Sequence, residues 1–163
     1  MSRAFVKEDA GGDEPLPERH VSEHPNRVTP AGLALLKEMV ARLRGEAADL
    51  SAVADDTAAA DRRRHVERDL RYFEARLATA EVVDPRKQPR DAVAFGATVT
   101  TRDARGERHV YSIVGEDEAD PESGKVSWVS PLGAVLTGAH VRETVCWRRP
   151  AGALDLTVER IEY

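Results

Sequence analysis

Carboxylate side chains gather in one stretch of the chain, and guanidinium groups follow them directly. Five acidic residues and no Lys or Arg lie between Glu46 and Asp61, with Asp55 and Asp56 adjacent to each other, and three consecutive arginines follow at 62–64. Carboxylate oxygens are the ligands that hard cations such as Mg²⁺ prefer. One interpretation is therefore an acidic group presented to a cation or a basic cleft. The other is that Asp55 or Asp56 caps the start of a helix.

Other groups with possible chemistry are weaker candidates. His20 and His24 have the spacing of metal ligands on a helix, but Pro25 argues against a helix there. His109 stands alone within a predicted strand. Cys146 is the single cysteine, which excludes an intrachain disulfide and fits a reducing cytosol. The sequence shows no phosphate-binding glycine loop, zinc spacing or nucleophile elbow.

The acidic stretch lies between two predicted helices. Apolar residues recur at alternating spacings of three and four, first at Leu33, Leu36, Val40, Leu43, Ala47 and Leu50, then at Val66, Leu70, Phe73, Leu77 and Ala80. Such narrow stripes need a partner, so we expect an antiparallel coiled coil over 29–84 that reverses near residues 56 and 57. Arms of about 26 residues would span roughly 35–40 Å. Asp55 and Asp56 would then lie at the tip.

The remaining segments predict a second, different unit. Residues 1–28 are polar and rich in Pro, Glu and Gly, which is typical of a flexible N-terminal extension, and 85–90 form a short linker. From 91 to 163 the apolar period changes to two, which predicts a compact antiparallel domain and an α+β fold overall. Its expected elements are strands at 96–102, 107–114, 125–130, 143–149 and 153–161 and a short helix at 131–136. The acidic run 116–122 is predicted to be a solvated loop.

The totals exclude several classes of protein. The chain has 163 residues and a net charge of −5, without an extended basic face, which argues against a stand-alone nucleic-acid binder. It contains neither a signal-peptide pattern nor an apolar run of the ~20 residues that a membrane span needs. We therefore expect a cytoplasmic protein that does not bind membranes.

Taken together, a series of short motifs resembles the bacterial transcript-cleavage factors GreA and GreB, over about residues 28–163. In chain order they are Val28-Thr29 with Gly32 and Leu36, Asp69-Leu70-Arg71-Tyr72, Phe95-Gly96-Ala97, Tyr111-Ser112-Ile113-Val114-Gly115-Glu116, Ser130-Pro131 with Gly138, and Ile161-Glu162-Tyr163. The opening residues 1–8 extend beyond the family core and are similar to a GreB-related branch.

The resemblance implies a fold and a mechanism. An FKBP-like domain would dock on the rim of the secondary channel of RNA polymerase, while the coiled coil enters that channel and brings its tip near the nascent RNA 3′ end. Tip carboxylates, here Asp55 and Asp56 and less favourably Asp49, would help to hold a Mg²⁺ shared with the polymerase, which hydrolyses backtracked RNA. Such a protein would be a monomer with no activity and no stably bound cofactor of its own. The family is also associated with DNA binding. We assign partner contacts to Ser130, Pro131, Leu132, Arg62, Arg63 and Arg64.

The chain departs from the family pattern, which leaves alternatives open. Ala52 and Val53 stand where the family carries Glu and Asn, Val129 replaces a frequent acidic residue, and the arms are shorter by roughly one heptad, or ~10 Å of reach. One alternative is a modulator that occupies the channel without stimulating cleavage. An FKBP-like peptidyl-prolyl isomerase is another, although Gre-type domains lack the aromatic-lined pocket this needs. A coiled-coil adaptor with a different partner is the third.

Overall fold

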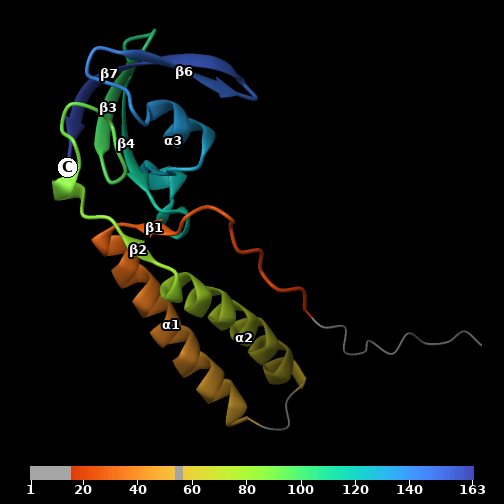
Figure 1. Cartoon of the computed structure of the whole chain (residues 1–163). Helices are drawn as coiled ribbons and strands as arrows, with labels where there is room; N and C mark the ends of the chain where they lie inside the picture. Colours follow the sequence, from red (N-terminus) through yellow and green to blue (C-terminus); the bar gives the residue numbers. More distant parts are fainter. Residues whose placement is uncertain (1–15, 54–56) are drawn as a thin grey trace, which may run out of the picture.

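A computed structural model describes residues 16–53 and 57–163, and in it a helical hairpin projects from one end of a β domain (Figure 1). Helix α1 runs over Pro30–Ser51 and helix α2 over Thr57–Ala78. Thr29 caps α1, because its side-chain oxygen accepts the Gly32 N–H at 2.9 Å. The predicted hairpin is confirmed, but each helix has 22 residues and spans about 33 Å, shorter than expected. Asp55 and Asp56 lie outside the described residues.

The two helices pack along the predicted apolar stripes. Leu36, Val40 and Leu43 of α1 are buried, as is Val66 of α2. Helix α2 ends at Ala78, before the predicted boundary at residue 84, because the chain turns there into a strand. That strand, β2 (Glu81–Val82), pairs in parallel with β1 (Arg27–Val28). Entry to the hairpin and exit from it are therefore joined at its base.

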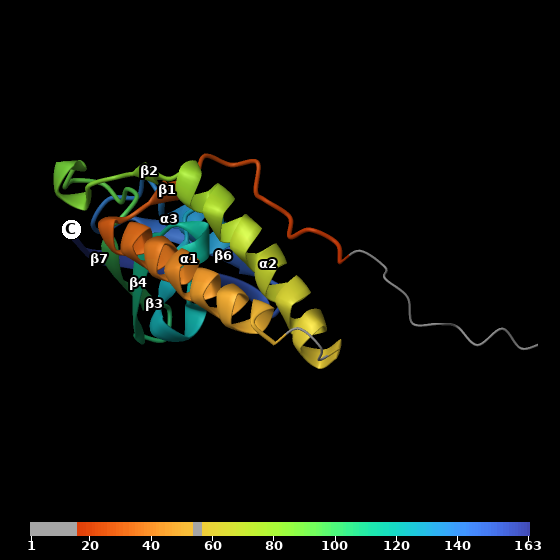
Figure 2. The ribbon, with the colours of Figure 1, turned by 90° about the horizontal axis from the view of Figure 1, so that it is seen from below.

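The N-terminal segment is more ordered than predicted. Residues 16–26 run beside α2 in both views of the ribbon (Figures 1 and 2). Residues 27 and 28 belong to β1 and donate and accept backbone hydrogen bonds at the base of the hairpin. The expectation of a flexible extension through residue 28 is wrong for this part, because specific polar and aromatic contacts hold it.

The β domain is a five-stranded sheet in the order β5-β4-β3-β7-β6. Its strands are β3 (Thr98–Asp103), β4 (Arg108–Val114), β5 (Lys125–Ser127), β6 (Thr144–Arg149) and β7 (Gly152–Glu162). All pairs are antiparallel except β4 with β5, which are parallel. The sheet is thus mixed rather than fully antiparallel, because a crossover containing the 3-10 turns η2 (Glu116–Glu118) and η3 (Pro121–Ser123) separates β4 from β5.

Helix α3 (Pro131–Leu136) completes the expected α+β arrangement. Its buried Leu132 and Leu136 join a core with residues of the sheet and its connections, namely Val93, Ala97, Val99, Ile113, Ala139, Leu156 and Val158. Gly138 follows the helix with a positive φ of 86°, a backbone conformation that favours glycine. No helix of the described part of the chain has the length and apolar character to cross a membrane.

Candidate functional site

The far end of the hairpin carries both exposed acids and arginines. Asp49 is exposed near the end of α1. The arginines after the tip have partners within the hairpin. Arg62 donates to Glu46 at 2.9 and 2.5 Å, Arg63 lies 3.5 Å from Glu67, and Arg64 donates to Asp61. These pairs are largely exposed, so a partner of higher charge could displace them at little cost.

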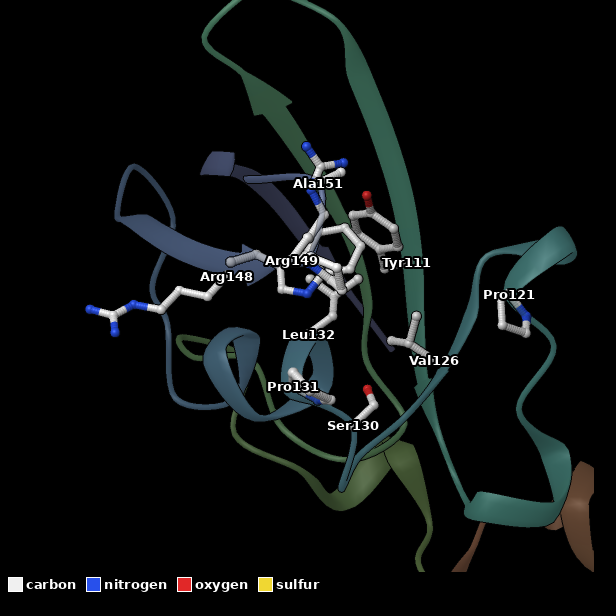
Figure 3. A pocket seen from close by; sticks show the side chains of 11 residues that line it. Tyr111, Pro121, Val126, Ser130, Pro131, Leu132, Arg148, Arg149 and Ala151 are labelled. Atoms are coloured by element: carbon white, nitrogen blue, oxygen red, sulfur yellow. The ribbon is translucent and has the colours of Figure 1, made fainter. Parts of the chain in front are cut away.

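The predicted contact residues Ser130, Pro131 and Leu132 lie together at a cavity of about 580 Å³ on the β domain. Tyr111, Val126 and Trp147 also line it, and most of the lining is apolar. Figure 3 shows the side chains of Tyr111, Val126 and Leu132 at the hollow, while that of Arg148 points away.

Ser130 has a positioning role at this cavity. Its hydroxyl accepts the Gly133 N–H at 3.1 Å and donates to the Ser127 carbonyl at 2.7 Å, so it caps α3 and ties the helix to β5. Leu132 is 4% exposed and belongs to the core. Pro131 is exposed and lines the cavity, which makes it the member of this trio most open to a partner.

Two aromatic rings and one guanidinium group give the cavity its chemistry. The Arg149 guanidinium lies 5.3 Å from the centre of the Trp147 ring, and burial raises the pKa of Tyr111. Two of the aromatic residues of this domain, Tyr111 and Trp147, therefore meet at one cavity. An apolar hollow with the Arg149 guanidinium at its border suits an apolar anchor residue that has an acidic side chain beside it.

A polar joint connects the hairpin to the β domain. Arg76 of α2 is 2% exposed, and its Nε donates to Asp117 at 2.5 Å while its NH2 group lies 3.5 Å from Glu116. The Tyr72 hydroxyl donates to the other Asp117 oxygen at 2.7 Å. At the start of α1, the Thr29 hydroxyl donates to Glu118 at 2.6 Å.

The joint was not predicted. The run 116–122 was expected to be a solvated loop, but its first three acids face a buried arginine, a tyrosine and a threonine. Tyr72 and Arg76 are four residues apart and therefore share one helix face beside the apolar stripe. This spacing was the one sequence signal that could have indicated a polar contact surface there. The partner of that face is distant in sequence, and no spacing rule identifies it.

The described residues also contain one group with metal-ligand chemistry, Asp103, Glu107 and His109, whose ligand atoms lie within 4.8 Å of one another. Asp103 accepts the N–H groups of Arg105 and Glu107, each at 2.9 Å, and lies 3.3 Å from His109 Nε2. Burial raises the pKa of Asp103, but these hydrogen bonds outweigh it and hold the pKa below its usual value. The group closes the turn between β3 and β4.

Comparison with known proteins agrees with this architecture. A family model described as "Transcription elongation factor, GreA/GreB, C-term" matches residues 88–163. The chain is 36% identical to transcription elongation factor GreA of Anaeromyxobacter sp. (strain K), over 83% of this chain and 91% of the relative. It is 40% identical to GreA of Trichlorobacter lovleyi, over 71% and 73%.

A solved GreA/GreB structure from Nitrosomonas europaea covers 84% of this chain and 98% of its own, with 23% identity and a TM-score of 0.43. That likeness is too weak to add to the assignment, which depends on the sequence relatives. These relatives carry the GreA name, so the predicted GreB-like branch stays a prediction. The 36% identity over nine-tenths of a GreA relative shows that this chain belongs to the GreA/GreB family of transcription elongation factors.

Proposed function

We propose that the chain binds bacterial RNA polymerase, with the β domain at the rim of the secondary channel and the hairpin inside the channel. The main support is that the β domain carries an apolar cavity at Ser130–Leu132 and also holds the hairpin through the Arg76–Asp117 joint. If the β domain docks through this cavity, its position therefore determines where the end of the hairpin lies.

At the end of the hairpin, Asp55 and Asp56 would present carboxylates close to the nascent RNA 3′ end. Asp49, exposed near the end of α1, offers a further hard oxygen ligand of the kind that Mg²⁺ prefers. A Mg²⁺ shared with the polymerase would neutralise charge that develops during phosphodiester hydrolysis. The chain itself would hold and orient the ion from one side, without hydrolysing RNA alone.

The short helices favour a second candidate function. With 22 residues in each helix, the hairpin spans about 33 Å, so its carboxylates could stop short of the polymerase active site. The protein would then occupy the channel and change elongation without stimulating cleavage.

Cleavage of a backtracked elongation complex separates these functions. We compare the wild type, the double variant Asp55→Ala/Asp56→Ala and the control Asp155→Ala, which removes an exposed carboxylate on β7. Stimulation that the tip variant loses and the control keeps would support carboxylate donation. Binding with altered elongation but no cleavage would support the modulator. Absence of binding by the wild type would reject both.

The docking surface has its own test. Pro131→Asp places a charge at the exposed edge of the cavity without touching the core, and we expect it to weaken polymerase binding at least tenfold. Val110→Asp is the control, because Val110 is an exposed apolar residue of β4 outside the cavity lining. Equal affinities of both variants and the wild type would place the docking surface elsewhere.

The aromatic lining also supports a candidate from another class, a peptidyl-prolyl isomerase. Tyr111 and Trp147 offer the kind of apolar wall against which a proline ring packs. A prolyl-peptide isomerisation assay with the wild type and Trp147→Ala decides this. A rate equal to the uncatalysed rate would remove the isomerase from consideration.

A further inference from the structure

Residues 16–26 form a segment that we call the strap, and it contacts the hairpin at several points. The Arg19 guanidinium lies 3.9 Å from the centre of the Tyr72 ring and 5.1 Å from that of Phe73. Glu18 accepts a hydrogen bond from Arg71 at 2.6 Å. The strap therefore covers the face of α2 whose tyrosine also donates to Asp117 of the β domain.

The strap is held most firmly where it reaches the joint. Asn26 is 5% exposed, and its side-chain amide donates to the Arg76 carbonyl at 2.6 Å and to the Thr79 hydroxyl at 3.2 Å. The Asn26 backbone carbonyl accepts the Glu81 N–H at 2.8 Å. The buried Nδ2 group thus has two acceptors, which matters because an unmade hydrogen bond there is costly, whereas Oδ1 is buried without a partner among the described residues. This end of the strap is thus part of the folded body.

The same segment also contacts the β domain. The His24 ring meets Trp128 edge-on, with 6.1 Å between ring centres, and the guanidinium of Arg27, the residue after the strap, lies 4.9 Å from the centre of the Trp128 ring. Trp128 lies between β5 and α3 and packs against the core of the β domain. One short stretch of chain is therefore attached to both bodies.

We propose that the strap fixes the direction of the hairpin relative to the β domain. The joint gathers its contacts around Arg76, Asp117 and Thr29 at the base of the hairpin, and contacts confined to the base permit small rotations there. Outside the joint, the strap adds attachments at Arg71 and Phe73 on the hairpin and at Trp128 on the domain, and these resist such rotation. This matters for the proposed function, because a small change of angle at the base displaces the end of a hairpin about 33 Å long by several ångströms.

The test measures the angle directly and needs no polymerase. Spin labels are placed on the natural exposed Cys146 of β6 and on Ser51→Cys at the end of α1, and the distance distribution between them is recorded. The strap variants are a chain beginning at Asn26 and the full chain with Arg19→Ala/His24→Ala. Arg42→Ala serves as the control. Arg42 is an exposed residue of α1 whose guanidinium donates to Met39 in the same helix, so its removal leaves the strap contacts intact.

We expect one narrow distribution for the wild type and for Arg42→Ala, and a distribution at least twice as wide, or shifted, for both strap variants. Unchanged width and position in the Arg19→Ala/His24→Ala chain would overturn the proposal, whether or not the truncated chain folds. Circular dichroism melting confirms that the labelled proteins are folded.

Failure of this proposal is distinguishable from failure of the proposed function. If the wild type does not bind polymerase, the distance distributions still report on the strap. If the wild type stimulates cleavage and the strap variants bind but do not stimulate it, both proposals are supported. Equal distributions together with normal cleavage would reject the strap alone.

Discussion

At the scale of single residues, Arg76 is the side chain on which the connection of the two bodies depends. It is 2% exposed, and its partner Asp117 has a side chain that is 10% exposed. A charge in such surroundings is tolerated because an opposite charge and hydrogen bonds accompany it. Removing Arg76 leaves Asp117 without its cation and with only the Tyr72 hydroxyl as a partner, and removing Asp117 leaves Arg76 with only the longer contact to Glu116.

We therefore expect Arg76→Leu to lower the free energy of unfolding by about 3–5 kcal/mol, since it leaves a buried carboxylate unpaired. Urea denaturation followed by circular dichroism measures this. The control is Arg44→Leu, which breaks an exposed pair with Glu74 and should cost less than about 1 kcal/mol. Equal costs for the two variants would contradict a buried ion pair at the joint.

Tyr72 makes the joint sensitive to alkaline pH. Burial, followed by the hydrogen bond to Asp117, raises the pKa of Tyr72 to about 12, whereas a tyrosine in the unfolded chain titrates near 10. Above pH ~10 the unfolded chain therefore binds fewer protons than the folded one. The resulting stabilisation is complete below that pH and is lost as the pH rises through about 12.

The measurement is the urea midpoint of the wild type and of Tyr72→Phe between pH 8 and pH 12. We expect the wild type to lose more stability across this range than the variant, which has no phenol to ionise at this site. At pH 8 the variant should already be less stable by about 1–2 kcal/mol, because Asp117 loses one donor. Parallel curves would show that Tyr72 is not the titrating group.

At the scale of elements, two helical glycines predict opposite effects of one substitution. A Cβ at Gly45 in α1 meets nothing within 4 Å, whereas a Cβ at Gly133 in α3 would lie 2.2 Å from the Ser127 carbonyl oxygen. The first position is an exposed helix interior, and the second is a close approach of backbone to backbone.

We expect Gly45→Ala to raise the free energy of unfolding by up to about 1 kcal/mol, because alanine is the better helix former. Gly133→Ala should lower it, since α3 must move away from β5. Thermal melts of the two variants give the signs. A destabilising Gly45→Ala would mean that α1 makes a contact at this point that the structure lacks.

Elements were more predictable than the contacts between them. Apolar residues spaced three and four apart predicted both helices. Apolar residues spaced two apart predicted strands within a few residues of β3, β4, β6 and β7, because each spacing is a local pattern of burial. The parallel pairing of β5 and the short strands β1 and β2 were missed, since they depend on partners distant in sequence. The same holds for the site. Ser130 and Pro131 line a cavity, and their contact with a partner stays a prediction, whereas Tyr111 and Trp147 of the same lining were not joined to them.

At the scale of the whole molecule, the length of the hairpin sets how far its end lies from the docking surface. Insertion of one heptad in each helix, with the apolar stripe kept in phase, adds about 10 Å. If the natural hairpin modulates without cleavage because it is short, the longer protein should stimulate cleavage while binding polymerase equally well. Insertion of four residues instead of seven in each helix is the control, because it shifts the apolar positions out of phase. Unaltered activity of the lengthened protein would show that reach is not the limiting factor.

The joint has a consequence for the order in which the chain folds. Its parts are Thr29, Tyr72, Arg76 and the acids at 116–118, so Arg76 leaves the ribosome before the acids that compensate its charge. Until residue 118 has emerged, the base of the hairpin must remain hydrated and loosely formed, because an isolated buried charge is too costly. The hairpin is thus a poor autonomous folding unit despite its local contacts, and both halves of the protein should be acquired, and lost, in a single cooperative transition.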